Sequence, residues 1–174
     1  AIVRNSLQYL DTLAQEAGND PSLQEELANA YEKVGDVQGR PGVLNLGGTA
    51  AALQSYRKSE GIRREVLRGT ENEAERDRRE EALANTLMRI SSILRATGDS
   101  RLALEADRTA LEMRRRLLDR KPDDVTRLRN VASSLTATST MPTVRRSRDY
   151  THRARHKKKR GRTRRMRQSP IWNL

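Results

Sequence analysis

Apolar residues recur three or four positions apart along most of residues 1–138, a spacing that predicts amphipathic helices. Glycine, proline or strongly charged stretches interrupt this pattern and mark the ends of the helices. We therefore expect six helices, over residues 3–17, 21–34, 50–67, 71–94, 102–118 and 125–135. The segment 36–49 contains four glycines and Pro41, so it is expected to be a loop.

A short pattern within these helices repeats. Leu27–Tyr31 is followed by Gly35 and Asp36, and Ile90–Leu94 is followed in the same way by Gly98 and Asp99. A third copy begins at Val131–Leu135. Each copy has a small residue after its first large one, which lets two helix backbones approach closely; these residues are Ala28, Ser91 and Ala132. A repeat of this kind favours stacked antiparallel helix pairs over the alternative, a simple bundle of amphipathic helices.

The pattern resembles the tetratricopeptide repeat. Ala52 and Tyr56 match its A-x3-F element, Ala103 and Ala110 supply small positions in the next copy, and Pro122 stands at the closing proline. The resemblance implies an all-α fold, an α-solenoid of helix pairs over residues 1–138, which acts as a protein-interaction scaffold.

A closer resemblance covers residues 6–67. The run SLQYLDTLAQEAGNDPSLQEELANAYEKVGDVQG, followed by an NLG-containing loop and AALQSYRKS, is similar to the tetratricopeptide region after the kinase domain of large bacterial serine/threonine kinases. This resemblance implies a sensory or docking extension from a larger signalling protein. The glycine-rich loop, HRD and DFG motifs of the kinase itself are absent from the sequence. We expect the chain to be cytoplasmic by default, and extracytoplasmic if it derives from a kinase that spans a membrane.

Residues 1–140 lack the side chains on which catalysis most often depends. They contain no Cys, Phe, His or Trp, and neither a phosphate-binding loop nor an apolar run long enough to span a membrane. Their carboxylates alternate with arginines, so we expect both on exposed helix surfaces, including Arg114, Arg115 and Arg116. We expect no enzymatic activity, no cofactor and no metal.

The first helix of each pair is expected to line a concave groove that binds a protein or peptide. The repeat register predicts which polar side chains face this groove, with Arg95 and Arg129 able to make charge-assisted hydrogen bonds. The alternative is that the same face is simply solvated. The predicted residues are Glu25, Asn29, Lys33, Asn85, Ser92, Arg95, Arg129 and Ser133.

The whole net charge of +12 lies in the last 34 residues, where 13 Lys and Arg accompany one acid, Asp149. Residues 139–174 are too charged and too poor in apolar side chains to bury a core, so we expect a disordered basic tail. Such a tail is suited to bind nucleic acid or another polyanion without sequence specificity. The residues predicted for that role are Arg155, Lys157, Lys158, Lys159, Arg160, Arg162, Arg164 and Arg165.

The tail begins where the third copy of the repeat should have its Gly-Asp turn. Ser139-Thr140 stands at the position of Gly-Asp, after which the apolar periodicity ends. A reading frame shifted in GC-rich coding DNA would produce such an arginine-rich continuation, and this hypothesis competes with a functional basic arm and with a localisation or anionic-surface signal. In each case the third copy lacks its second helix, which exposes Val131 and Leu135 and predicts fraying or self-association at that end.

Overall fold

The computed structural model describes residues 2–18, 20–42 and 44–139, all of which belong to one of the two units into which the chain divides, Ala1–Met141. The predicted disordered tail from residue 140 onward lies outside the described residues. The division of function between residues 1–138 and 139–174 therefore stays a prediction.

The described residues form six helices and no strands, so the predicted all-α fold is confirmed for this part of the chain. The helices are α1 (Ile2–Glu16), α2 (Pro21–Gly39), α3 (Thr49–Arg68), α4 (Glu73–Ala96), α5 (Ser100–Arg120) and α6 (Val125–Ser139). Their ends follow the capping chemistry of the sequence. Asp20 Oδ1 accepts hydrogen bonds from Ser22 and Leu23 N–H, and Asp124 Oδ1 does the same for Thr126 and Arg127.

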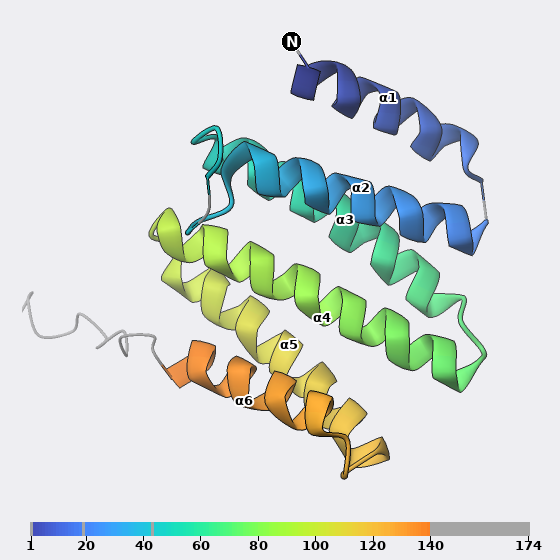
Figure 1. The fold of residues 1–174 in the computed structure, drawn as a ribbon, viewed down its shortest axis with the longest axis vertical. Coiled ribbons are helices and arrows are strands. Elements are labelled where there is room, and N and C mark those ends of the chain that lie inside the picture. Colours follow the sequence, from blue (N-terminus) through green and yellow to red (C-terminus); the bar gives the residue numbers. More distant parts are fainter. Residues whose placement is uncertain (1, 19, 43, 140–174) are drawn as a thin grey trace, which may run out of the picture. The chain divides into compact units, whose positions relative to one another are not determined.

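The helices follow one another in chain order, and each packs against the next (Figure 1). Polar side chains also join helices that are two apart in the sequence. Thr86 of α4 donates to Glu32 of α2, and Asn130 of α6 donates to Glu81 of α4 at 3.0 Å. The helices α2, α4 and α6 therefore form one row, and in the view of Figure 1 this row lies in front of α3 and α5.

The repeated small residues pack as expected in the first two copies. Ala28 and Ser91 are fully buried, and Ser91 Oγ donates to the backbone carbonyl of Ala103 at 3.1 Å. In the third copy Ala132 is exposed, because among the described residues no second helix covers α6. Exposed apolar side chains on α6 are Val125, Leu128 and Leu135, whereas Val131 is partly buried.

The expected loop over residues 36–49 is shorter than predicted, because α2 continues to Gly39. Gly35 and Gly39 are helical positions at which a neighbour comes too close for a side chain. A Cβ on Gly35 would lie 2.7 Å from the Tyr56 ring, and one on Gly39 would lie 2.7 Å from the backbone of Gly48. These glycines allow α3 and its preceding turn to pack against α2 and do not end the helix.

The expectation that charged residues lie on exposed helix surfaces is wrong for several of them. The helix interfaces bury Glu32, Glu60, Asp77, Glu80 and Asp107 together with Arg63 and Arg114. Arg114 was expected on a solvated face, yet it is only 5% exposed, whereas its neighbours Arg115 and Arg116 are exposed. Each buried charge has a partner of opposite sign, which is the condition for burial at a tolerable cost.

Candidate functional site

A groove runs across the row formed by α2, α4 and α6. Its volume is about 440 Å³, and side chains from all three helices line it, together with Arg63 from α3 and Arg114 from α5. The lining residues are Asn29, Glu32, Arg40, Arg63, Ala82, Asn85, Met88, Arg89, Arg114 and Ser133. We call this cavity the α2–α4–α6 groove. Its polar lining and its length across three helices suit a segment of polypeptide better than a small apolar molecule.

Two asparagines in the groove are held in the same way. Asn29 Oδ1 accepts from Arg63 Nη2 at 2.7 Å, and Asn85 Oδ1 accepts from Arg114 Nη2 at 2.6 Å. In each case an arginine of the second helix in a pair holds an asparagine of the first helix, and both arginines are buried. Because the oxygen of each amide is occupied, its NH₂ group is left to donate to a bound molecule.

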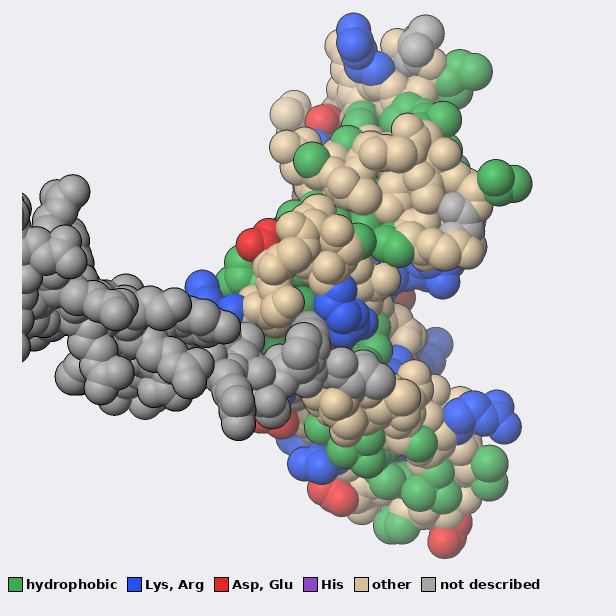
Figure 2. Space-filling model, turned by 90° about the vertical axis from the view of Figure 1, so that its left-hand side faces the viewer, with side chains coloured by type: hydrophobic (Ala, Val, Ile, Leu, Met, Phe, Trp, Pro, Cys, Tyr) green, Lys and Arg blue, Asp and Glu red, His purple; other side chains and the backbone are tan. Residues whose placement is uncertain are grey.

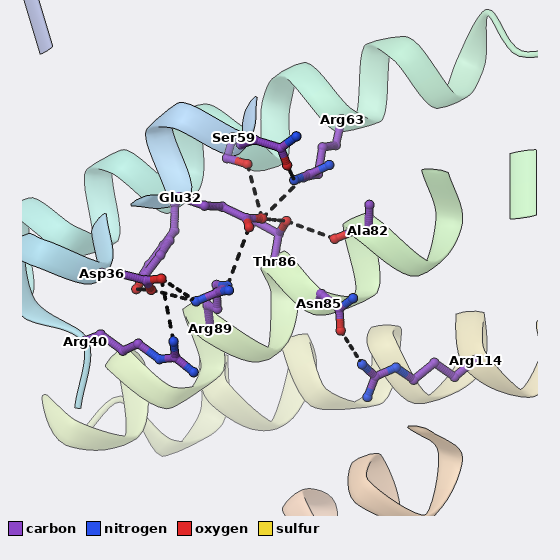
Figure 3. Close-up of polar contacts among 12 residues, drawn as sticks. Glu32, Asp36, Arg40, Ser59, Arg63, Ala82, Asn85, Thr86, Arg89 and Arg114 are labelled. Carbon is purple, nitrogen blue, oxygen red and sulfur yellow. Dashed lines mark hydrogen bonds and ion pairs between the residues drawn. The ribbon is translucent and has the colours of Figure 1, made fainter. Parts of the chain in front are cut away.

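Glu32 connects α2 with both α3 and α4. One of its oxygens accepts from Arg63 Nε at 3.3 Å, from Ser59 Oγ at 3.5 Å and from the Thr86 hydroxyl. The other oxygen lies 3.5 Å from Arg89 Nε. Figure 3 shows these groups converging on the Glu32 carboxylate from the two neighbouring helices. The carboxylate thus fixes the walls of the α2–α4–α6 groove and is not itself free to bind a ligand.

Arg114 has the equivalent position between α4, α5 and α6. Its guanidinium donates to Glu81 at 3.2 Å, to Asn85 at 2.6 Å and to Ser134 at 2.8 Å. A further bond of 3.2 Å reaches the backbone carbonyl of Asn130. One buried cation thus joins three helices and holds Asn85, which lines the groove; Figure 3 shows the bond between Asn85 and Arg114.

Four arginines and one carboxylate, Glu32, line the groove, and carboxylates beside the groove neutralise most of the remaining positive charge. Asp36 accepts from Arg89 at 2.6 Å and 2.9 Å and lies 3.6 Å from Arg40. Tyr56 also donates to Asp36 at 2.6 Å, and burial together with this hydrogen bond raises the pKa of Tyr56 above its ordinary value. On the face drawn in Figure 2 the basic side chains of the described residues likewise form separate groups among acidic and apolar ones. The free groups of the groove therefore offer hydrogen bonds more than net charge.

A second tyrosine–carboxylate pair joins α1 to α2. Tyr31 donates to Asp11 at 2.5 Å, and Lys58 also bonds Asp11 while its ammonium lies 5.2 Å from the centre of the Tyr31 ring. The hydrogen bond from Lys58, followed by that from Tyr31, lowers the pKa of Asp11 below its usual value. Burial and the bond to Asp11 raise the pKa of Tyr31. This cluster therefore fixes α1 on α2 and α3, away from the groove.

The structure brings three of the eight predicted groove residues together, namely Asn29, Asn85 and Ser133. Glu25 lies in a separate cavity of about 70 Å³, where it pairs with Arg79 at 2.5 Å. Arg95 pairs at 2.5 Å with the fully buried Asp107 of α5, so its guanidinium is directed at the helix interface.

The remaining three predicted residues do not line the groove. Lys33 and Arg129 are exposed and make no hydrogen bond or ion pair with another described residue, and Ser92 is partly buried. The basic residues predicted to bind polyanions, Arg155 to Arg165, lie outside the part of the chain that is described.

Sequence reasoning missed the charged residues that organise the groove. Their position in the helical register could have predicted their burial. Arg114 lies three positions after Leu111 and three before Leu117, and because both leucines are buried, Arg114 shares their buried face. Arg63 stands in the same relation to Val66, and Glu32 lies four positions after Ala28. A charged residue at a register position of a buried face thus indicates a buried ion pair.

Among the described residues, no group of three or more His, Cys, Asp or Glu side chains is placed to hold a metal ion. None of the described helices combines the length and the apolarity that a bilayer crossing requires.

Comparison of the chain with protein-family models, with curated proteins and with solved structures finds no match.

Proposed function

We propose that this chain is a non-catalytic interaction scaffold, an α-solenoid of tetratricopeptide type that binds an extended segment of another protein in the α2–α4–α6 groove. The observation that carries the proposal is the repeated pair of asparagine and buried arginine, Asn29 with Arg63 and Asn85 with Arg114. Each pair presents an amide N–H donor to the groove, and an extended peptide offers backbone carbonyls that need such donors.

The arrangement of the helices supports the same proposal. Polar contacts join α2 to α4 and α4 to α6, as expected if the first helix of each pair lines one continuous surface. The resemblance of the sequence to the region after bacterial serine/threonine kinase domains points to a docking role in signalling.

The proposal can be tested with a peptide selected on the full chain from a displayed random library, whose affinity is then measured by fluorescence anisotropy. In the double variant Asn29→Ala/Asn85→Ala, Arg63 and Arg114 keep their carboxylate partners, so the fold should persist. We expect the Kd to rise at least about tenfold, because two hydrogen bonds to the peptide are lost.

The matched control is Asn5→Ala/Gln54→Ala, which removes two exposed amides outside the groove. This control should bind the peptide as the unsubstituted chain does. An unchanged Kd in Asn29→Ala/Asn85→Ala, with the fold retained by circular dichroism, would show that the amides of the groove do not bind the peptide.

The alternative function is the binding of nucleic acid or another polyanion through the tail, favoured by the 13 basic residues after Thr140. In the full chain, replacement of Lys157, Lys158, Lys159 and Arg160 by glutamine should weaken binding to a DNA duplex and make it less dependent on salt. If the same replacement also abolishes binding of the selected peptide, the peptide is held by the tail and the scaffold proposal fails.

A further inference from the structure

A second cavity lies on the opposite side of α4 from the groove. It has a volume of about 550 Å³ and is lined by side chains of α3, α4 and α5. On α4 it uses residues 76, 80 and 83, whereas the groove uses residues 82, 85, 88 and 89. At about 100° of rotation per residue, these two sets point in opposite directions from the helix axis. The cavity is therefore independent of the proposed peptide site.

This second cavity is lined by five arginines and a single carboxylate, Glu80. The arginines come from three helices and are Arg64, Arg68, Arg76, Arg116 and Arg120. We call the cavity the arginine pocket. Since a guanidinium carries five N–H donors and no acceptor, its lining is strongly biased towards an anionic ligand.

Glu80 holds two of the guanidinium groups close together. It is only 6% exposed and accepts from Arg116 at 2.9 Å and 3.1 Å and from Arg120 at 2.5 Å. Arg120 also lies 3.2 Å from the buried Asp77. One wall of the pocket is thus preorganised, with its cations fixed before any ligand arrives, which reduces the entropy lost on binding.

The other wall carries cations that are less fully neutralised. Arg76 donates to the backbone carbonyl of Thr70 at 2.9 Å and makes no ion pair with another described residue. Arg68 pairs with Glu65 at 2.7 Å, but both side chains are well exposed and such a pair contributes little. Arg64 pairs with Glu60 at 2.8 Å. Arg76 and Arg68 are therefore the cations most available to a ligand.

The floor of the arginine pocket is apolar. Leu83 and Met113 are buried and Leu67 is partly buried, and all three line the cavity. Apolar surface beside guanidinium groups strengthens their attraction for an anion, because it excludes water from one side of the contact.

We propose that the arginine pocket binds a linear di- or triphosphate group. Guanidinium groups match phosphate oxygens with pairs of parallel hydrogen bonds, and arginines on three helices can reach several phosphates at once. The volume is that of a ligand site and exceeds what one phosphate would fill. The group comes either from an inorganic polyphosphate or from a nucleotide, whose base would rest on the apolar floor.

The test is calorimetric titration of the full chain with inorganic tripolyphosphate. The variant Arg68→Gln/Arg76→Gln leaves the buried carboxylates Glu80 and Asp77 with their partners, so it should remain folded. We expect it to raise the Kd at least about tenfold, because two charge-assisted contacts are lost.

The matched control is Arg78→Gln/Arg101→Gln, which removes the same charge from two arginines that are each 77% exposed and lie outside the pocket. This control should change the Kd less than twofold. An equal loss of affinity in both double variants would overturn the proposal, because binding would then follow the overall charge. No loss in Arg68→Gln/Arg76→Gln would also overturn it and assign the binding to other basic residues, such as those after Thr140. The absence of any saturable binding would overturn it as well.

A second titration, with ATP, distinguishes the two sources of the phosphate group. Tighter binding of ATP than of tripolyphosphate would assign the site to a nucleotide, with the apolar floor under its base. Equal or weaker binding of ATP would assign it to the phosphate chain alone.

Discussion

Two interfaces of the molecule each have one buried charge at their centre. The charge is negative between α2, α3 and α4, and positive between α4, α5 and α6. In the first, the Glu32 carboxylate accepts from side chains of α3 and α4. In the second, the Arg114 guanidinium of α5 donates to acceptors on α4 and α6. The two interfaces have related packing, yet they respond differently to the loss of their central charge.

The two interfaces differ in how many other hydrogen-bond partners remain for the residues that contact the central charge. Around Glu32, Arg63 also bonds Asn29, and Arg89 also bonds Asp36. Around Arg114, the hydroxyl of Ser134 and the carbonyl of Asn130 both accept from the one guanidinium, and the hydroxyl has a further contact only with Met88 Sδ at 4.0 Å. Because Ser134 is the only fully buried residue of α6 among those described, α6 relies on this cation far more than α2 relies on Glu32.

The largest effect is expected for Arg114→Met, which removes the buried cation together with its hydrogen bonds to Glu81 and Asn85 on α4 and to Asn130 and Ser134 on α6. The free energy of unfolding should fall by about 4 kcal/mol. Chemical denaturation measures this loss, and hydrogen exchange should show α6 amides losing protection before those of α4. Arg115→Met, at an exposed position, is the control and should cost less than about 0.5 kcal/mol. Full protection of α6 in Arg114→Met would contradict the role assigned to the cation.

Equivalent leucines in the second and third copies sharpen the comparison. Leu94 is buried in the core formed with Tyr56 and Ile90, whereas Leu135 is 39% exposed on α6. Leu94→Ala should destabilise the fold by about 3 kcal/mol through the cavity it leaves, and Leu135→Ala by about 1 kcal/mol or less. Comparable losses, measured by denaturant unfolding, would mean that α6 is covered in solution, for instance by self-association.

The variant Glu32→Gln tests the interface between α2, α3 and α4, which has the Glu32 carboxylate at its centre. The amide keeps an acceptor for Arg63 and Thr86 but replaces the oxygen that faces Arg89 with an NH₂ group and removes the charge, so we expect a loss of about 1.5 kcal/mol. The double variant Glu32→Gln/Asn29→Ala removes the charge of one partner of Arg63 and the side-chain acceptor of the other, and it should cost more than the sum of its two single variants. Strict additivity would show that the alternative partner does not protect this interface.

The smallest effect is expected for Tyr56→Phe, which removes one hydrogen bond to Asp36 and should cost about 1 kcal/mol at neutral pH. The pKa of Tyr56 is higher in the folded chain than in the unfolded chain, where a tyrosine titrates near pH 10. The folded state therefore holds this proton more tightly, and the stabilisation is complete below about pH 10 and is lost as the pH rises further. Unfolding measured from pH 8 to 11 should show a shallower alkaline decline in Tyr56→Phe, and an identical decline would exclude this contribution.

The candidate groove could be predicted only in part. Asn29, Asn85 and Ser133 follow from the helical repeat, because they lie on the solvent side of helices whose other face is apolar. Arg95 was misplaced, since its long side chain turns to the buried Asp107 on α5 instead of the groove. The arginine pocket was not predicted, because its residues come from three helices whose relative rotation the periodicity of one helix does not specify.

By itself the sequence determined the number of helices and most of their ends, because apolar periodicity, Asp20 and Asp124 act within a few residues along the chain. Tertiary structure decided what local rules could not. Gly35 continues α2 because the Tyr56 ring occupies the space of its side chain, and Arg114 is buried because acceptors on α4 and α6 compensate for its lost hydration. Both outcomes depend on contacts between residues at least 16 positions apart, which exist only once the helices have packed.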